Sequence, residues 1–182
     1  MDETFKSSWY NERPIIIHII HMHEAKFVKD MERGVLTVER VFDATPEKMW
    51  SAHTESEMLG EWWAPKPWKA MTVSMDFREG GRWFYYMLGP EGEKNYCAVE
   101  YTSVDPEKSF MGSDYFCDEN GKRDESMPTM EWKTEFAPEG SGTKLVSTIV
   151  YPSGADLEKI LSMGMEAGYT MALDQLEELL SK

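Results

Sequence analysis

The chain has 182 residues, of which 33 are acidic and 19 basic, so its formal net charge is −14. This length predicts one domain with a short appendage, and the acidity disfavours nucleic acids and anionic membrane surfaces as partners. Two cysteines without a paired-cysteine motif disfavour a disulfide framework and a zinc ribbon, and they indicate a reducing, cytoplasmic location.

Residues 1–33 differ from the rest and are predicted to be an N-terminal extension to a domain at residues 34–182. The apolar run at 14–20 is shorter than the roughly 20 residues that span a bilayer, and no small-residue cleavage site follows it. We expect an edge strand or irregular structure here, or a segment upstream of a functional start near Met31.

Three histidines in this extension, His18, His21 and His23, suggest a metal site. On a strand His21 and His23 share a face that His18 does not, and on a helix only His18 and His21 are neighbours. Because no regular element presents all three, we expect no metal and no cofactor.

Regular structure is predicted from Val35 onward. Apolar residues alternate over 35–42 and indicate a strand. Thr45 is a good N-cap and Pro46 a good first helical residue. Two short helices are therefore expected, at Pro46–His53 and Glu55–Trp63, ended by two prolines.

A succession of strands is predicted next, with most joins rich in Gly, Pro, Asp and Glu. The expected strands are Lys69–Asp76, Gly81–Leu88, Asn95–Ser103, Ser109–Cys117, Thr129–Phe136 and Lys144–Tyr151. Short joins imply an antiparallel meander. The longer, charged link at 118–128 is expected to be a mobile loop.

The last segment, Ala155–Lys182, is predicted to be one uninterrupted amphipathic helix that opens at Ser153. Its apolar face contains Gly164 and Gly168, although a glycine inside a helix costs about 1 kcal/mol relative to alanine. We therefore expect these glycines to border an internal cavity. A curved antiparallel sheet covered by this helix gives an α+β fold.

Five stretches resemble, in the same order, the motifs of the SRPBCC, or START-like, superfamily. They are Arg40–Trp50, Leu59–Pro65, Phe77–Trp83, Gly142–Leu145 and Gly168–Leu176. Together they resemble the branch called activator of heat-shock protein ATPase homologue, C-terminal-domain-like, over about residues 34–182. One departure is Tyr169, where the family commonly has Trp.

This resemblance implies the helix-grip fold and a hydrophobic cavity between sheet and helix. It leaves function open, because the superfamily includes lipid carriers, hormone receptors, cyclases and co-chaperone domains.

The cavity wall is expected to be aromatic and methionine-rich, in a chain with 14 Met and 7 Trp residues. The predicted ligand-binding residues are Trp62, Trp63, Trp83, Tyr85, Met87, Trp132, Met165, Gly168 and Tyr169. The alternative is a filled core in which Met163 and Met165 occupy the room that the glycines leave. Trp62 and Trp63 either form an aromatic gate, or one plugs the core while the other covers it half-exposed.

Candidates for acid–base chemistry are Glu100, Asp114, Glu131 and His53. None has a partner visible in the sequence that would tune its pKa, so each is expected to be structural and no catalytic residue is assigned.

Cys97 and Cys117 lie on strands joined by one turn, nearly equidistant from it. They can approach across the ladder, whereas a shift of one residue in register would put them on opposite faces. Free thiols are the expectation.

Three functions remain open. The first is a non-catalytic module that binds an apolar or aromatic small molecule. The second, implied by the resemblance, is a stress-related interaction domain that acts on a chaperone ATPase. The third is a cofactor-free enzyme for a hydrophobic substrate. A homodimer is also left open.

Overall fold

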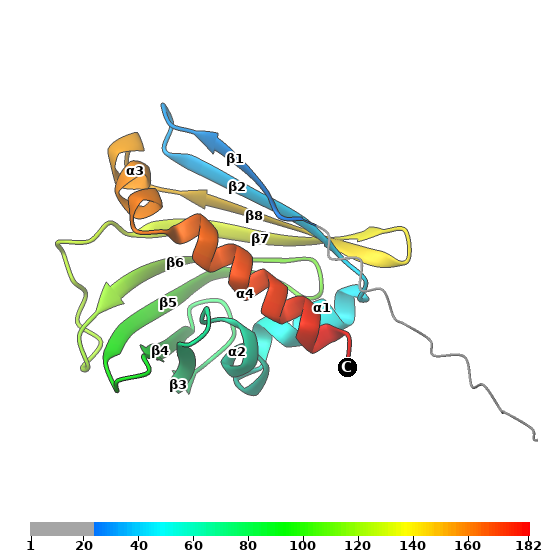
Figure 1. The fold of residues 1–182 in the computed structure, drawn as a ribbon, viewed down its shortest axis with the longest axis horizontal. Coiled ribbons are helices and arrows are strands. Elements are labelled where there is room, and N and C mark those ends of the chain that lie inside the picture. Colours follow the sequence, from blue (N-terminus) through cyan, green and yellow to red (C-terminus); the bar gives the residue numbers. More distant parts are fainter. Residues whose placement is uncertain (1–23) are drawn as a thin grey trace, which may run out of the picture.

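A computed structural model of the chain describes residues 24–182 (Figure 1). The run at 14–20 and the three histidines of the extension lie outside the described residues. Within them, one antiparallel sheet of eight strands curves around the C-terminal helix, with the other helices at its ends (Figure 1). The predicted α+β helix-grip fold is confirmed.

The element bounds agree with the predicted strands and short helices to within a few residues. The strands are β1 (Lys26–Asp30), β2 (Val35–Phe42), β3 (Lys69–Met75), β4 (Arg82–Leu88), β5 (Lys94–Asp105), β6 (Ser109–Cys117), β7 (Met130–Glu139) and β8 (Gly142–Val150). The helices are α1 (Pro46–Thr54), α2 (Ser56–Trp62), α3 (Gly154–Ser162) and α4 (Met165–Leu180). The strand order is β1-β2-β8-β7-β6-β5-β4-β3, so β3 to β8 form a meander and β2 joins beside β8.

Strand β1 forms one edge of the sheet. It pairs antiparallel with β2, from Lys26 opposite Glu39 to Asp30 opposite Val35. This part of the N-terminal segment is thus an edge strand, continuous with the sheet that carries the core.

The prediction of a single, uninterrupted C-terminal helix is wrong. The segment is two helices, α3 and α4, separated at Met163 and Gly164. Gly164 adopts φ +89°, in the left-handed region that ends helices, and its N–H donates to the Leu161 carbonyl at 3.0 Å. Of the two glycines Gly164 and Gly168, only Gly168 lies inside a helix.

The core lies between α4 and the concave face of the sheet. Leu36 on β2, Leu145 on β8, and Leu173 and Leu176 on α4 are fully buried there. α4 crosses this face diagonally, from the corner with α3 toward α1 (Figure 1). The concave face of the sheet and α4 are therefore the two walls available for a cavity.

The loop after β6 folds back on the outer face of the sheet. Its Gly121 carbonyl accepts from Arg82 Nη2 at 3.1 Å, and the Asp124 N–H donates to the Phe116 carbonyl at 2.9 Å. Over residues 24–182, no helix is both long and apolar enough to cross a membrane.

Candidate ligand-binding cavity

A cavity of about 370 Å³ lies between α4 and the concave face of the sheet. It is lined by His53, Trp63, Pro65, Tyr85, Met87, Cys97, Phe110, Asp114, Phe116, Met130, Trp132, Thr134, Ser147, Ile149, Ile160, Met163, Gly164, Met165, Gly168, Tyr169 and Ala172. Aromatic and aliphatic side chains predominate in this lining, as they do in binding sites for small organic molecules.

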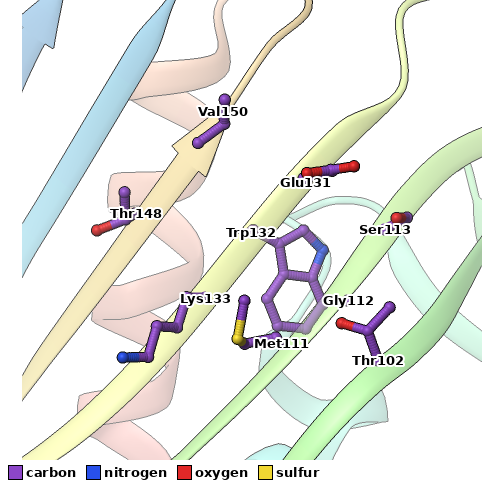
Figure 2. A pocket seen from close by; sticks show the side chains of 9 residues that line it. All are labelled: Thr102, Met111, Gly112, Ser113, Glu131, Trp132, Lys133, Thr148 and Val150. Atoms are coloured by element: carbon purple, nitrogen blue, oxygen red, sulfur yellow. The ribbon is translucent and has the colours of Figure 1, made fainter.

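A second hollow, also of about 370 Å³, lies on the outer face of the sheet (Figure 2). Its lining residues are Thr102, Met111, Gly112, Ser113, Glu131, Trp132, Lys133, Thr148 and Val150. In Figure 2 these residues sit across neighbouring strands, with α4 behind the sheet. Met111 and Val150 are exposed. The outer hollow lies on the face of the sheet away from α4, whereas the inner cavity lies between the sheet and α4.

The inner cavity brings together all the predicted ligand-binding residues except Trp62 and Trp83. Trp62 is fully buried in the core and donates from Nε1 to the Ala52 carbonyl at 2.8 Å. Trp83 stacks on Tyr85 with 3.9 Å between ring centroids and does not itself line the cavity. Both tryptophans pack against rings that line the cavity.

Trp63, next to Trp62 in sequence, lies on the cavity itself. Its Nε1 donates to the hydroxyl of Tyr85 at 3.0 Å, and its ring packs edge-on against those of Trp62 and Trp83. The two adjacent tryptophans therefore have different positions. Trp62 is buried in the core, whereas Trp63 is half-buried and forms part of the cavity wall.

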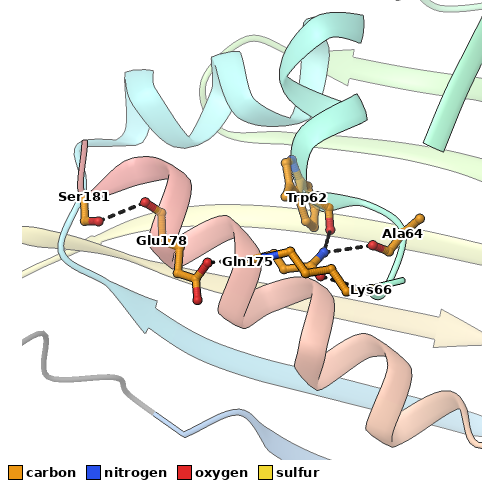
Figure 3. Close-up of polar contacts among 6 residues, drawn as sticks. All are labelled: Trp62, Ala64, Lys66, Gln175, Glu178 and Ser181. Atoms are coloured by element: carbon orange, nitrogen blue, oxygen red, sulfur yellow. Dashed lines mark hydrogen bonds and ion pairs between the residues drawn. The ribbon is translucent and has the colours of Figure 1, made fainter. Parts of the chain in front are cut away.

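The loop that carries Trp63 is tied to α4 by the amide of Gln175 (Figure 3). Its Nε2 donates to the carbonyls of Trp62 and Ala64, both at 2.8 Å, and its Oε1 accepts from the Lys66 N–H at 3.0 Å. A buried amide satisfied in this way fixes the loop against the helix. Sequence reasoning missed Gln175, although a glutamine on the apolar face of a helix was a signal.

Both glycines of the C-terminal segment line the cavity. A Cβ placed on Gly168 would lie 3.7 Å from Pro65 Cγ, an ordinary contact, so larger side chains there would extend into the space. Met163, another lining residue, is 61% exposed, and the cavity therefore reaches the surface at the corner between α3 and α4.

Three hydroxyls form a chain on the β7–β8 side of the cavity. Tyr169 Oη donates to Ser147 Oγ at 3.0 Å, and Ser147 Oγ lies 3.2 Å from Thr134 Oγ1. Burial raises the pKa of Tyr169, so it stays a neutral donor. The buried hydroxyl of Tyr169 thus has a hydrogen-bond partner.

Asp114 on β6 is the carboxyl group of this lining. Burial raises its pKa to about 7, opposed by a hydrogen bond from the Tyr115 backbone. It remains half-buried by accessible surface because it faces the cavity.

His53 on α1 also lines the cavity. Its Nδ1 lies 2.7 Å from the Met49 carbonyl and therefore carries the proton. Burial lowers the pKa of His53 to about 4, so the ring is neutral at pH 7. Of the four acid–base candidates, the structure thus brings Asp114 and His53 to the same cavity.

The other two candidates lie elsewhere. Glu100 is exposed and accepts from the hydroxyl of Tyr115 at 2.7 Å, and Glu131 borders the outer hollow. Neither has access to the inner cavity.

The two cysteines are free and lie on opposite faces of the sheet. Cys97 pairs with Phe116, and Cys117 pairs with Tyr96, so the register is offset by one residue. Cys97 faces the cavity, where burial raises its pKa and keeps it a neutral thiol. Among residues 24–182, no cluster of three His, Cys, Asp or Glu side chains could hold a metal ion.

Comparison with known proteins gives consistent results. Protein Ms6760 from Mycobacterium smegmatis is 31% identical, with a TM-score of 0.79, over 85% of this chain and 95% of that one. A protein from Arthrobacter aurescens is 27% identical, with a TM-score of 0.81, over 86% and 91%. One from Staphylococcus epidermidis is 28% identical, with a TM-score of 0.77, over 86% and 93%.

No curated protein matches the chain. The model of a family described as "Activator of Hsp90 ATPase homolog 1-like protein" matches residues 43–181, which contain strands β3 to β8 and all four helices. The resemblance in the sequence motifs is thereby confirmed, and the chain belongs to the Activator of Hsp90 ATPase homolog 1-like family.

Proposed function

We propose that this protein binds an apolar or aromatic small molecule in the cavity between α4 and the sheet. The observation that carries the proposal is the cavity itself, about 370 Å³ and walled mainly by aromatic side chains and methionines. Sites for small organic molecules commonly measure about 300–1,000 Å³. The filled-core alternative is disfavoured because the methionines border this space without closing it.

The test uses the neutral fluorescent probe N-phenyl-1-naphthylamine with the wild-type chain, Gly168→Ala and Gly168→Leu. Gly168→Ala meets Pro65 at an ordinary distance and should leave uptake unchanged. Gly168→Leu projects an isobutyl group into the cavity, and we expect its affinity to fall by about tenfold or more. Unchanged uptake by a folded Gly168→Leu variant would sink the proposal.

A second candidate is a cofactor-free enzyme for a hydrophobic substrate, favoured by Asp114 on the cavity. A carboxyl group whose pKa is near 7 can give or take a proton at neutral pH. Compounds that bind should then exchange an acidic C–H for deuterium in D₂O faster with the wild-type chain than with Asp114→Asn. Equal exchange rates for the two proteins would argue against catalysis.

The family description supplies a further candidate, a cytoplasmic, stress-related domain that stimulates a chaperone ATPase. Its support is membership of the family and the net charge of −14, which offers an acidic contact surface. The measurement is the ATPase rate of purified Hsp90 with and without this protein. An unchanged rate over a range of protein concentrations would count against the candidate.

A further inference from the structure

We infer that the cavity selects an aromatic amine, whose protonated nitrogen pairs with the Asp114 carboxylate while its rings occupy the apolar space. The inference deepens the proposed function, and rests on it, by naming the chemical class of the ligand. It follows from the position of Asp114, from the charges of the lining and from the rings around it.

Apart from the Tyr115 backbone, no group of the described residues is paired with the carboxyl of Asp114. On the sheet it lies between Val99 of β5 and Met130 of β7, both apolar. Among the described residues, no side chain donates a hydrogen bond to it and no Lys or Arg forms an ion pair with it. A carboxyl group that faces a cavity without such a partner is a recognition group for a donor on a ligand.

The rest of the lining disfavours an anionic ligand. No Lys or Arg among residues 24–182 lines the cavity, and His53 is neutral at pH 7. A fatty acid or another carboxylate would lose its hydration, find no cation and meet Asp114. The net charge of the chain, −14, adds repulsion at longer range. A cationic ligand is attracted both by Asp114 and by the negative net charge of the chain.

The surrounding rings suit an aromatic cation. Trp63, Tyr85 and Trp132 line the same cavity as Asp114, as do Phe110 and Phe116. Aromatic faces attract an ammonium group within about 6 Å, and they also bury the apolar part of the ligand. The carboxylate and the rings therefore favour the same ligand, a molecule that is both aromatic and positively charged.

The protonation state of Asp114 should govern this preference. The titratable side chains near Asp114 or on the same cavity are Tyr85, Cys97, Tyr101, Cys117, Tyr151, Tyr169 and His53. Burial raises the pKa of each tyrosine and cysteine above its usual value and lowers that of His53 to about 4. The pKa of Asp114 is about 7, so its ionisation should strengthen amine binding as the pH rises from 6 to 8.

The experiment compares three probes with one ring system by calorimetry at pH 8: 1-naphthylmethylamine, 1-naphthylmethanol and 1-naphthoic acid. The wild-type chain should bind the amine about tenfold or more tightly than the alcohol, and the acid most weakly. Asp114→Asn keeps the shape and should lose the preference for the amine over the alcohol. Asp43→Asn, the same charge change at an exposed site, should leave the order unaltered.

The outcomes separate the inference from the proposed function. If the wild-type chain binds the alcohol as tightly as the amine, or if Asp114→Asn keeps the preference, the inference is overturned, while binding of the alcohol still supports an apolar site. If the wild-type chain binds none of the probes, the proposed function itself fails. Should Asp114→Asn not fold, the wild-type preference at pH 6 and pH 8 decides, and a constant ratio overturns the inference.

Discussion

Gly164 and Gly168 stand four residues apart on the same wall of the cavity, yet their backbones differ. Gly164 has φ +89°, a conformation that L side chains rarely adopt, and a Cβ there would meet nothing within 4 Å. Gly168 lies inside α4 with an ordinary contact to Pro65. Only the first glycine is required by the fold, and the second leaves room.

Alanine at these two positions should therefore change stability in opposite directions. Gly168→Ala should raise the free energy of unfolding by about 0.5–1 kcal/mol, because alanine is the better helix former. Gly164→Ala should lower it by about 1–2 kcal/mol, because of strain in the left-handed region. Denaturant titration of both variants measures the difference. Equal effects of either sign would contradict the assignment of the helix break.

The positions of Trp62, Trp63 and Asp114 could not be predicted from the sequence. Trp62 and Trp63 could not be assigned separate roles, because adjacent residues differ only in how α2 rotates against the sheet. Asp114 was hard to place because β6 alternates poorly: Met111 and Tyr115 on its outer side are as apolar as Phe110 and Phe116 on its inner side. On β4, rings lie on both faces, and burial separates them: Trp83 and Tyr85 are buried, whereas Phe84 and Tyr86 are only partly buried.

At the scale of elements, α4 is fixed to the sheet by an ion cluster as well as by apolar contacts. Arg40 of β2, whose side chain is 1% exposed, contacts Asp174 Oδ1 at 2.5 Å through Nη1, and Glu177 through Nη2. Glu177 is itself buried. Loss of the arginine would leave a buried carboxylate without its cation, which costs more than the pair contributes.

Arg40→Met should lower the free energy of unfolding by about 3–5 kcal/mol, since it keeps much of the side-chain volume and removes the charge. The matched control is Lys29→Met, which removes the ion pair between Lys29 and Glu166 (2.8 Å), where both side chains are more than a third exposed. That change should cost less than about 1 kcal/mol. Thermal or denaturant unfolding measures both variants. Similar losses of unfolding free energy in the two variants would show that the buried ion cluster contributes no more to stability than the exposed ion pair.

Most element bounds could be predicted because their ends are local: Thr45 caps α1 through the Lys48 N–H at 3.3 Å, and Ser153 caps α3. The break between α3 and α4 could not, because Gly164 preserves the helical spacing of the apolar residues on both sides. Whether the helix ends at Gly164 depends on its φ angle, and the spacing of apolar residues in the sequence does not reveal that angle. The break would have been predicted if Gly164 had been interpreted as the glycine that commonly follows the end of a helix.

At the scale of the whole molecule, two buried groups give the stability opposite dependences on pH. His53 has a folded pKa of about 4, below its usual 6.5, so the unfolded chain takes up the proton first and stability falls as pH drops from about 6.5 to 4. Asp114 has a folded pKa of about 7, above its usual 3.8, so stability falls as pH rises from about 3.8 to 7. Between pH 4 and 6.5 the two effects oppose each other.

Removing one group should reveal the other. Asp114→Asn should become more stable with rising pH between 4.5 and 6.5, and His53→Phe less stable, each by up to about 1.4 kcal/mol per pH unit relative to the wild-type chain. The measurement is the free energy of unfolding at pH 4.5, 5.5 and 6.5. Parallel pH profiles for all three proteins would show that neither group titrates as described.

The amide of Gln175 has a consequence for how fast a ligand could enter and leave. The wall at Trp62–Lys66 moves only if three hydrogen bonds to that amide break together, whereas the corner at Met163 and Gly164 is a two-residue turn with an exposed side chain. Residence time should therefore be set at the corner. Backbone amides at 162–165 should exchange with deuterium more slowly when a ligand is bound, while those at 62–66 stay unchanged.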